Sequence, residues 1–150
     1  MDRTHVENIL PIRLESYMQE FEEDMKLNEN NIHEKTFLRS GIAAKWARYS
    51  YEEERYKKQI LDKIEELKET ITQKLFEKKK EDIINQRTSE MKIKIEVEQI
   101  LKKSTQYAKI KDELSNQDDI IRFIIEAKQI ISSFGFDIKN SIEVLKIENI

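Results

Sequence analysis

The most regular hydrophobic pattern runs through the middle of the chain, from about residue 31 to residue 76. Apolar side chains recur there at steps of three and four residues, with one step of seven. They are Ile42, Trp46, Tyr49, Tyr56, Ile60, Ile64, Leu67, Ile71 and Leu75. This spacing places them on one side of an α-helix. We therefore predict one very long central helix, spanning on the order of 70 Å at about 1.5 Å per residue.

Shorter helices are predicted before and after this segment. Residues 12–26 carry apolar residues at helical spacing and an acidic opposite face. Residues 99–150 are predicted to form the C-terminal helices, of which one resumes at Gln99. The next begins at a cap on Asp118 and ends at Gly135, and the last begins at Asp137.

Residues 77–94 break the helical pattern and form a polar, basic connector. At its end, Met91, Ile93, Ile95 and Val97 alternate with charged residues. A period of two is typical of a half-buried strand. We therefore predict a short strand or extended segment near residues 91–97.

The composition favours an all-α fold. Only 2 glycines and 1 proline are present, too few for the turns of a β-sandwich or barrel. Charged residues make up 38% and hydrophobic residues another 38%, which suits long helices that bury one narrow stripe and share a core with partner subunits. We predict one elongated domain over residues 1–150, which assembles with further copies of itself into a homo-oligomer. The predicted oligomerisation residues are Trp46, Ile60, Ile64, Leu67, Ile71, Ile138, Ile142 and Leu145.

No catalytic or metal-binding pattern is present in the sequence. There is no cysteine, and His5 and His33 lack partners at metal-ligand spacing. The two glycines, Gly41 and Gly135, are too far apart for a phosphate-binding loop. We therefore expect no enzyme activity and no cofactor. Charged residues interrupt the apolar stretch Ile120–Ile131, so we expect no membrane span.

The basic connector is the candidate functional surface. Its cations are Lys74, Lys78, Lys79, Lys80, Arg87, Lys92 and Lys94. Such residues neutralise phosphates, and the neighbouring Phe76 is a candidate for stacking on a base. The alternative is that these lysines form an ordinary solvated face. Repetition of the patch in an oligomer favours nucleic acid, because weak contacts add through avidity.

Short motifs across the chain give it a resemblance to a known family. In order, they are Arg13-Leu14-Glu15, Gln19-Glu20, Lys45-Trp46, Tyr56-Lys57-Lys58-Gln59-Ile60-Leu61, Ser89-Glu90-Met91-Lys92 and Gly135-Phe136-Asp137-Ile138-Lys139. In this order and spacing the sequence resembles the UvsY family of recombination mediators from large tailed phages.

The resemblance implies a small helical protein that forms ring-like homo-oligomers in the cytoplasm of the infected bacterial host. It implies binding to single-stranded DNA and loading of a RecA-like phage recombinase, against competition from the phage single-strand-binding protein. A Lys-x-Arg pair late in the long helix is tied to DNA contact in the family. Here the two positions align with Thr72 and Lys74, so only the second is basic.

Two functions of different classes follow from the sequence. The first is a single-stranded-DNA-binding recombination mediator. The second is a coiled-coil structural protein or assembly scaffold, which the composition and heptads fit equally well. The localised basic connector distinguishes them, because a scaffold does not need it.

Overall fold

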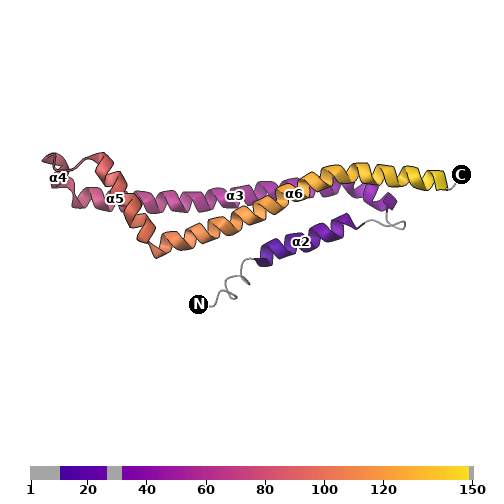
Figure 1. Ribbon diagram of the computed structural model, residues 1–150, viewed down its shortest axis with the longest axis horizontal. Helices are drawn as coiled ribbons and strands as arrows, with labels where there is room; N and C mark the ends of the chain where they lie inside the picture. The colour runs from indigo at the N-terminus through magenta and orange to yellow at the C-terminus, as the bar shows by residue number, and fades with distance from the viewer. Residues whose placement is uncertain (1–10, 27–31, 149–150) are drawn as a thin grey trace. The chain divides into compact units, whose positions relative to one another are not determined.

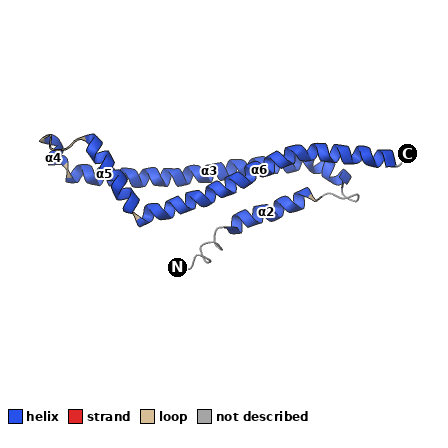
Figure 2. Ribbon diagram, viewed as in Figure 1, coloured by secondary structure: helices blue, strands red, loops and turns tan. Residues whose placement is uncertain are grey.

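The computed structural model describes residues 11–26 and 32–148, and every regular element in these ranges is an α-helix (Figures 1 and 2). The helices are α2 (Pro11–Met25), α3 (Ile32–Lys78), α4 (Lys80–Ile84), α5 (Glu90–Lys103) and α6 (Thr105–Glu148). The prediction of an all-α fold is confirmed, and the predicted long central helix is α3. Within the described residues, no helix is both long enough and apolar enough to cross a membrane.

The chain divides into two compact units. Unit 1 comprises Met1–Glu54 and Asp118–Ile150, and unit 2 comprises Arg55–Gln117. Both α3 and α6 contribute residues to each unit. Unit 2 contains 16 basic and 12 acidic residues, a net charge of +4, whereas unit 1 contains 11 basic and 18 acidic residues, a net charge of −7. The small net charge of the chain therefore conceals two units of opposite sign.

The core of unit 1 is built from three helices around Trp46. The buried residues come from α3 and α6: Ile42, Trp46, Ile120, Ile124, Ala127 and Ile131. Helix α2 covers them with Leu14, Tyr17, Phe21 and Met25. The Trp46 ring meets Phe21 and Tyr49 edge-on, with ring centroids 5.6 and 5.3 Å apart. Aromatic pairs favour this geometry, which adds to the stabilisation from apolar burial.

The core of unit 2 joins α3, α5 and their neighbours. Leu75 of α3 packs with Ile93, Val97 and Leu101 of α5. Partly buried residues surround them: Leu67, Ile71, Phe76, Ile83 and Tyr107. Because Ile93, Val97 and Leu101 are spaced four residues apart, they form one face of a helix, and that face holds α5 on α3.

The predicted strand near residues 91–97 is wrong, because this segment lies in α5. Its alternating pattern has a different cause. Ile93 and Val97 face the core, while Met91 and Ile95 are 73% and 55% exposed. Each pair is spaced by four residues, so two different faces of one helix are apolar. Because the two faces are offset by two residues along the chain, every second residue of the sequence is apolar.

The predicted division of the C-terminal region is also wrong, since α6 continues through Asp118, Gly135 and Asp137. A single glycine costs a helix about 1 kcal/mol, and no proline enforces a break there. The break that does occur lies at Ser104, which ends α5. Its side chain accepts a hydrogen bond from the Tyr107 N–H at 3.2 Å and so caps α6.

The predicted oligomerisation residues differ in their surroundings. Trp46 and Ile60 are 0% and 5% exposed within one chain, so folding of a single chain already buries them, and a contact between subunits stays a prediction for both. Ile64, Leu67 and Ile71 are partly exposed, so a contact role for them stays a prediction. The side chains of Ile138, Ile142 and Leu145 lie outside the described residues.

Gly41 offers a simple test of α3. It lies inside the helix, and an added Cβ would meet nothing within 4 Å. Replacing Gly41 with Ala should therefore raise the free energy of unfolding by about 0.5–1 kcal/mol, because Ala has less freedom to lose on folding. Urea unfolding followed by circular dichroism measures the change. A decrease would show that another helix packs closely on this position.

Candidate nucleic-acid interface

The candidate surface is formed by the last turns of α3, by α4 and by the first turns of α5, all in unit 2. Its position is fixed by the core below it. Leu75 and Phe76 of α3, Ile83 of α4 and Ile93 of α5 pack in the same cluster. The cations between these anchors are therefore carried on a folded surface and not on a free linker.

The turn from α4 to α5 places Arg87. Gln86 adopts a left-handed conformation with φ of 55°. The Arg87 N–H then donates to the Asp82 carbonyl at 2.7 Å, which closes the turn. Ser89 is the N-cap of α5, and its hydroxyl accepts from the Lys92 N–H at 3.3 Å. This side-chain cap satisfies one of the free N–H groups at the helix start.

Lys79 differs from the other predicted DNA-binding residues. Its Nζ lies 2.6 Å from Glu96 Oε2 of α5, and the side chain is 29% exposed. A carboxylate at this distance offsets most of the lysine's attraction for a phosphate. Lys79 therefore holds α5 against the end of α3, and its role in binding nucleic acid remains a prediction that this ion pair weakens.

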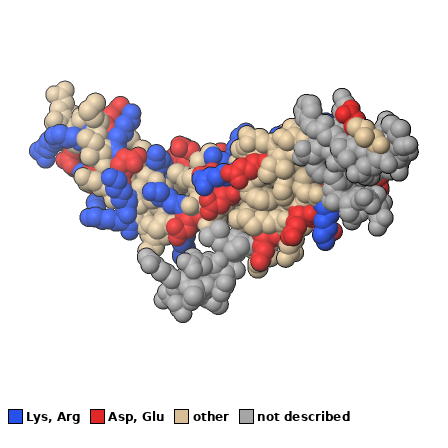
Figure 3. Space-filling model, turned by 45° about the vertical axis from the view of Figure 1, so that its right-hand side comes forward, with Lys and Arg blue, Asp and Glu red and all other residues tan. Residues whose placement is uncertain are grey.

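The remaining six predicted cations face solvent. They are Lys74, Lys78, Lys80, Arg87, Lys92 and Lys94. Within the described part of the chain, no ion pair involves any of them. Figure 3 shows blue atoms gathered with fewer red ones over the end of unit 2 that holds α4 and α5. This surface can attract a polyanion, and the attraction will be weakened by salt.

Phe76 is less available for stacking on a base than its place in the sequence suggested. It is partly buried and packs against the unit 2 core. Because the ring packs against this core, only part of it remains accessible to a base. The exposed apolar residues near the cations are instead aliphatic: Ile84, Met91 and Ile95.

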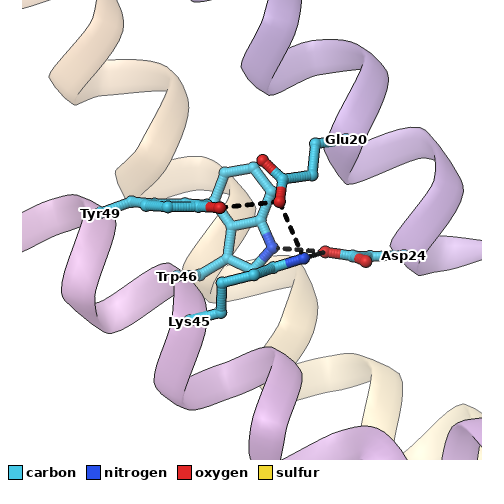
Figure 4. A network of polar contacts seen from close by, with 5 residues as sticks. All are labelled: Glu20, Asp24, Lys45, Trp46 and Tyr49. Carbon is cyan, nitrogen blue, oxygen red and sulfur yellow. Dashed lines mark hydrogen bonds and ion pairs between the residues drawn. The ribbon is translucent and has the colours of Figure 1, made fainter.

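Unit 1 has a polar network between α2 and α3 (Figure 4). Lys45 Nζ lies 2.7 Å from Asp24 and 3.0 Å from Glu20. The Trp46 Nε1–H donates to Asp24 at 2.8 Å, and the Tyr49 hydroxyl donates to Glu20 at 2.7 Å. Two acids of α2 are thus committed to positioning this helix.

A second polar contact lies along the same pair of helices. Arg13 and the Tyr17 hydroxyl both donate to Glu53, which is 1% exposed. A buried carboxylate is tolerated because both its oxygens are hydrogen-bonded. Burial and this hydrogen bond raise the pKa of Tyr17 well above its usual value. Burial and the Glu20 hydrogen bond also raise the pKa of Tyr49.

These raised pKa values predict alkaline destabilisation. Each phenol stays protonated in the folded chain at a pH where it ionises in the unfolded chain. Their contribution to stability is therefore complete below about pH 10 and is lost as the pH rises above it. Between about pH 9.5 and 11.5 the free energy of unfolding should therefore fall, by at most about 1 kcal/mol once solvent screening of these partly exposed phenols is included.

Urea unfolding at both pH values measures the decrease. The double substitution Tyr17→Phe with Tyr49→Phe is the control and should flatten the dependence. An equal decrease in the double variant would show that other groups cause it.

Comparison with known proteins identifies a solved structure with a similar fold. No family model and no curated protein matches the sequence. The crystal structure of the bacteriophage T4 recombination mediator protein UvsY matches the fold with a TM-score of 0.68. The match covers 91% of this chain and 99% of the UvsY chain, at 16% sequence identity. This chain has a UvsY-like fold. The resemblance drawn from short sequence motifs is thereby confirmed for the fold.

Within the UvsY-like fold, α5 carries two further cations outside the predicted site. Lys102 and Lys103 lie in its last turn and are exposed. The sequence pattern ended the basic segment at Lys94, because it indicated a strand at 91–97 and a new helix after it. Ser89 is a residue type that often caps helices. A helix predicted from this cap would have placed Lys92, Lys102 and Lys103 on one element.

Proposed function

We propose that this protein is a recombination mediator that binds single-stranded DNA. On this proposal it loads a RecA-like phage recombinase onto single strands coated by the phage single-strand-binding protein. The fold likeness to T4 UvsY over 91% of the chain is the observation that carries the proposal. The surplus of exposed cations in unit 2 supports it, because a mediator must hold DNA in competition with another binding protein. The site of action is the cytoplasm of the infected bacterial host.

The proposed DNA-binding residues are the six exposed cations of the candidate surface. Each phosphate contact releases condensed counterions, so the affinity should fall steeply with salt and depend little on base sequence. One copy offers a modest patch. A ring-like homo-oligomer repeats it around one assembly, and the linked contacts then strengthen binding by avidity.

The proposed mechanism is an equilibrium hand-over without covalent chemistry. The oligomer holds or bends a single strand on several copies of the basic surface, which opens a place for the recombinase to begin its filament. The exposed acids of α2, such as Glu15 and Glu22, are proposed to contact a protein partner. Glu20 and Asp24 are not, because they bind Lys45 within the chain.

A loading assay tests the function directly. Circular single-stranded DNA is coated with the phage single-strand-binding protein, and DNA-dependent ATP hydrolysis by the RecA-like recombinase of the same phage is followed. Adding this protein should shorten the lag and raise the final rate. An unchanged lag over a range of salt concentrations would contradict the mediator role and favour a structural or scaffold protein.

A further inference from the structure

Helix α5 has a second apolar face that folding does not use. Ile93, Val97 and Leu101 complete the face that packs on the core. Met91 and Ile95 lie on the opposite side and are 73% and 55% exposed. Together they form a small apolar patch on the solvent side of a helix whose core face is already complete. These two are the same residues that gave the sequence its strand-like alternation.

Lysines flank this face on both sides. At about 100° per residue, Lys92 and Lys94 lie roughly 80° to either side of the line through Met91 and Ile95. Glu98 and then Lys102 continue that line toward the end of the helix. All three lysines are exposed. The face therefore combines an apolar centre with cationic edges.

Two of the three acids of α5 are paired with lysines of other segments. Glu96 is held by Lys79 at 2.6 Å, and Glu98 is held by Lys68 at 3.3 Å. Lys68 belongs to α3, and Lys79 lies between α3 and α4. These ion pairs offset two carboxylates, of which Glu98 lies on the same line as Met91 and Ile95. With the exposed Glu90 counted as one negative charge, Lys92, Lys94 and Lys102 still leave a small positive surplus. An anion with apolar groups is the chemistry that complements such a face.

We infer that the outward face of α5 contacts the bases of single-stranded DNA through Met91 and Ile95, while Lys92 and Lys94 hold the adjoining phosphates. This inference rests on the proposed function. It explains why the protein would prefer single-stranded DNA to a duplex. Single strands expose base faces that a duplex stacks away, and Met and Ile side chains pack on or between bases in other complexes. The thioether of Met also makes favourable contacts with aromatic rings.

The size of the face favours DNA over a protein partner. Two side chains cover about one or two bases. A specific protein–protein interface buries about 800 Å² on each partner, which needs a much larger apolar patch. Charge complementarity points the same way, because a phosphate backbone brings one negative charge for each nucleotide.

The test compares two oligonucleotides of equal charge. Full-length protein is titrated into a fluorescein-labelled 20-nucleotide oligo-dT and into a 20-unit abasic strand with the same phosphates, and the anisotropy is measured. The variant combines Met91→Gln with Ile95→Thr. The control combines Met18→Gln with Ile130→Thr, which changes the same residue types at 45% and 50% exposed positions of unit 1.

The wild-type protein should bind oligo-dT about tenfold more tightly than the abasic strand, because base contacts are worth that order of affinity. The variant should bind oligo-dT about fivefold more weakly, bind the abasic strand unchanged and keep the same salt slope. The control should match the wild type. Replacing Lys92 and Lys94 with Gln should weaken both strands equally and reduce the salt slope.

Three results would overturn the inference. If the Met91/Ile95 variant keeps the wild-type ratio of oligo-dT to abasic affinity, these residues do not contact bases, although the proposed DNA binding still stands. If sedimentation shows that the variant assembles less than the control, the face joins copies of the chain. If the wild type binds neither strand at low salt, the proposed function fails together with the inference.

Discussion

Replacing Trp46 with Ala should lower the free energy of unfolding by about 3–5 kcal/mol. Trp46 is 0% exposed and joins α2, α3 and α6 through Phe21, Tyr49 and Phe123. Its removal leaves a cavity in the unit 1 core. It also leaves Asp24 without the indole N–H that donates to it at 2.8 Å.

Urea unfolding monitored by circular dichroism measures this loss. Trp46→Phe is the matched variant, because it keeps most of the apolar volume and removes the indole N–H. It should cost about 1–2 kcal/mol. Met91→Ala is the surface control and should change stability by less than about 0.5 kcal/mol. A Trp46→Ala protein as stable as the wild type would contradict the packing of α2 on α3 and α6.

Neutralising four exposed cations of the candidate surface in unit 2 should weaken binding to oligo-dT by about 100-fold at low salt. The variant changes Lys74, Lys78, Lys80 and Arg87 to Gln. Each of these side chains faces solvent, and none has an ion pair within the described residues. If all four contact phosphates, the slope of log affinity against log salt should decrease in magnitude by about 3.

The matched control removes the same charge from unit 1. It changes Arg39, Arg48, Arg122 and Lys128 to Gln, all of which are exposed. Affinity should then change only slightly. Equal losses in the two variants would show that net charge alone governs binding, and the unit 2 surface would not be the site. Lys79→Gln should mainly reduce stability, because Lys79 already pairs with Glu96.

The helical character of this chain could be predicted from its sequence, but the helix boundaries could not. The stripe from Ile42 to Leu75 predicts α3 because it keeps one period over many turns. Asp118 and Gly135 look like boundaries because these residue types often cap helices. In this chain neither residue ends a helix, because α6 continues through both. Ser104 was the true cap, and its local sequence is less conspicuous.

The sequence predicts which residues the candidate site contains. It does not predict which of them contact each other in the folded chain. The cations of residues 74–94 are visible in the sequence, but Lys79 cannot be distinguished from its neighbours there. Its partner Glu96 is 17 residues away and reaches it only after α5 folds back on α3. Phe76 likewise looks available next to lysines and is taken up by the core.

Alternation at Met91 to Val97 predicted both the structure and the burial of this segment incorrectly. Every second residue is apolar, as the sequence indicates. Half of these residues are buried and half are exposed, because the segment is a helix with two apolar faces. The error identifies the residues that folding does not require, and these are the ones proposed to contact bases.

Native mass spectrometry of the full-length protein, with and without a 20-nucleotide oligo-dT, tests the central claim most directly. The claim is that an oligomer of this chain binds single-stranded DNA through unit 2. The account predicts ions of one multi-subunit assembly that gains the mass of the oligonucleotide and loses it as the ammonium acetate concentration rises. The four-residue variant of unit 2 should form the same assembly without the added mass. Monomer ions alone, or an assembly that never gains the oligonucleotide, would contradict the account.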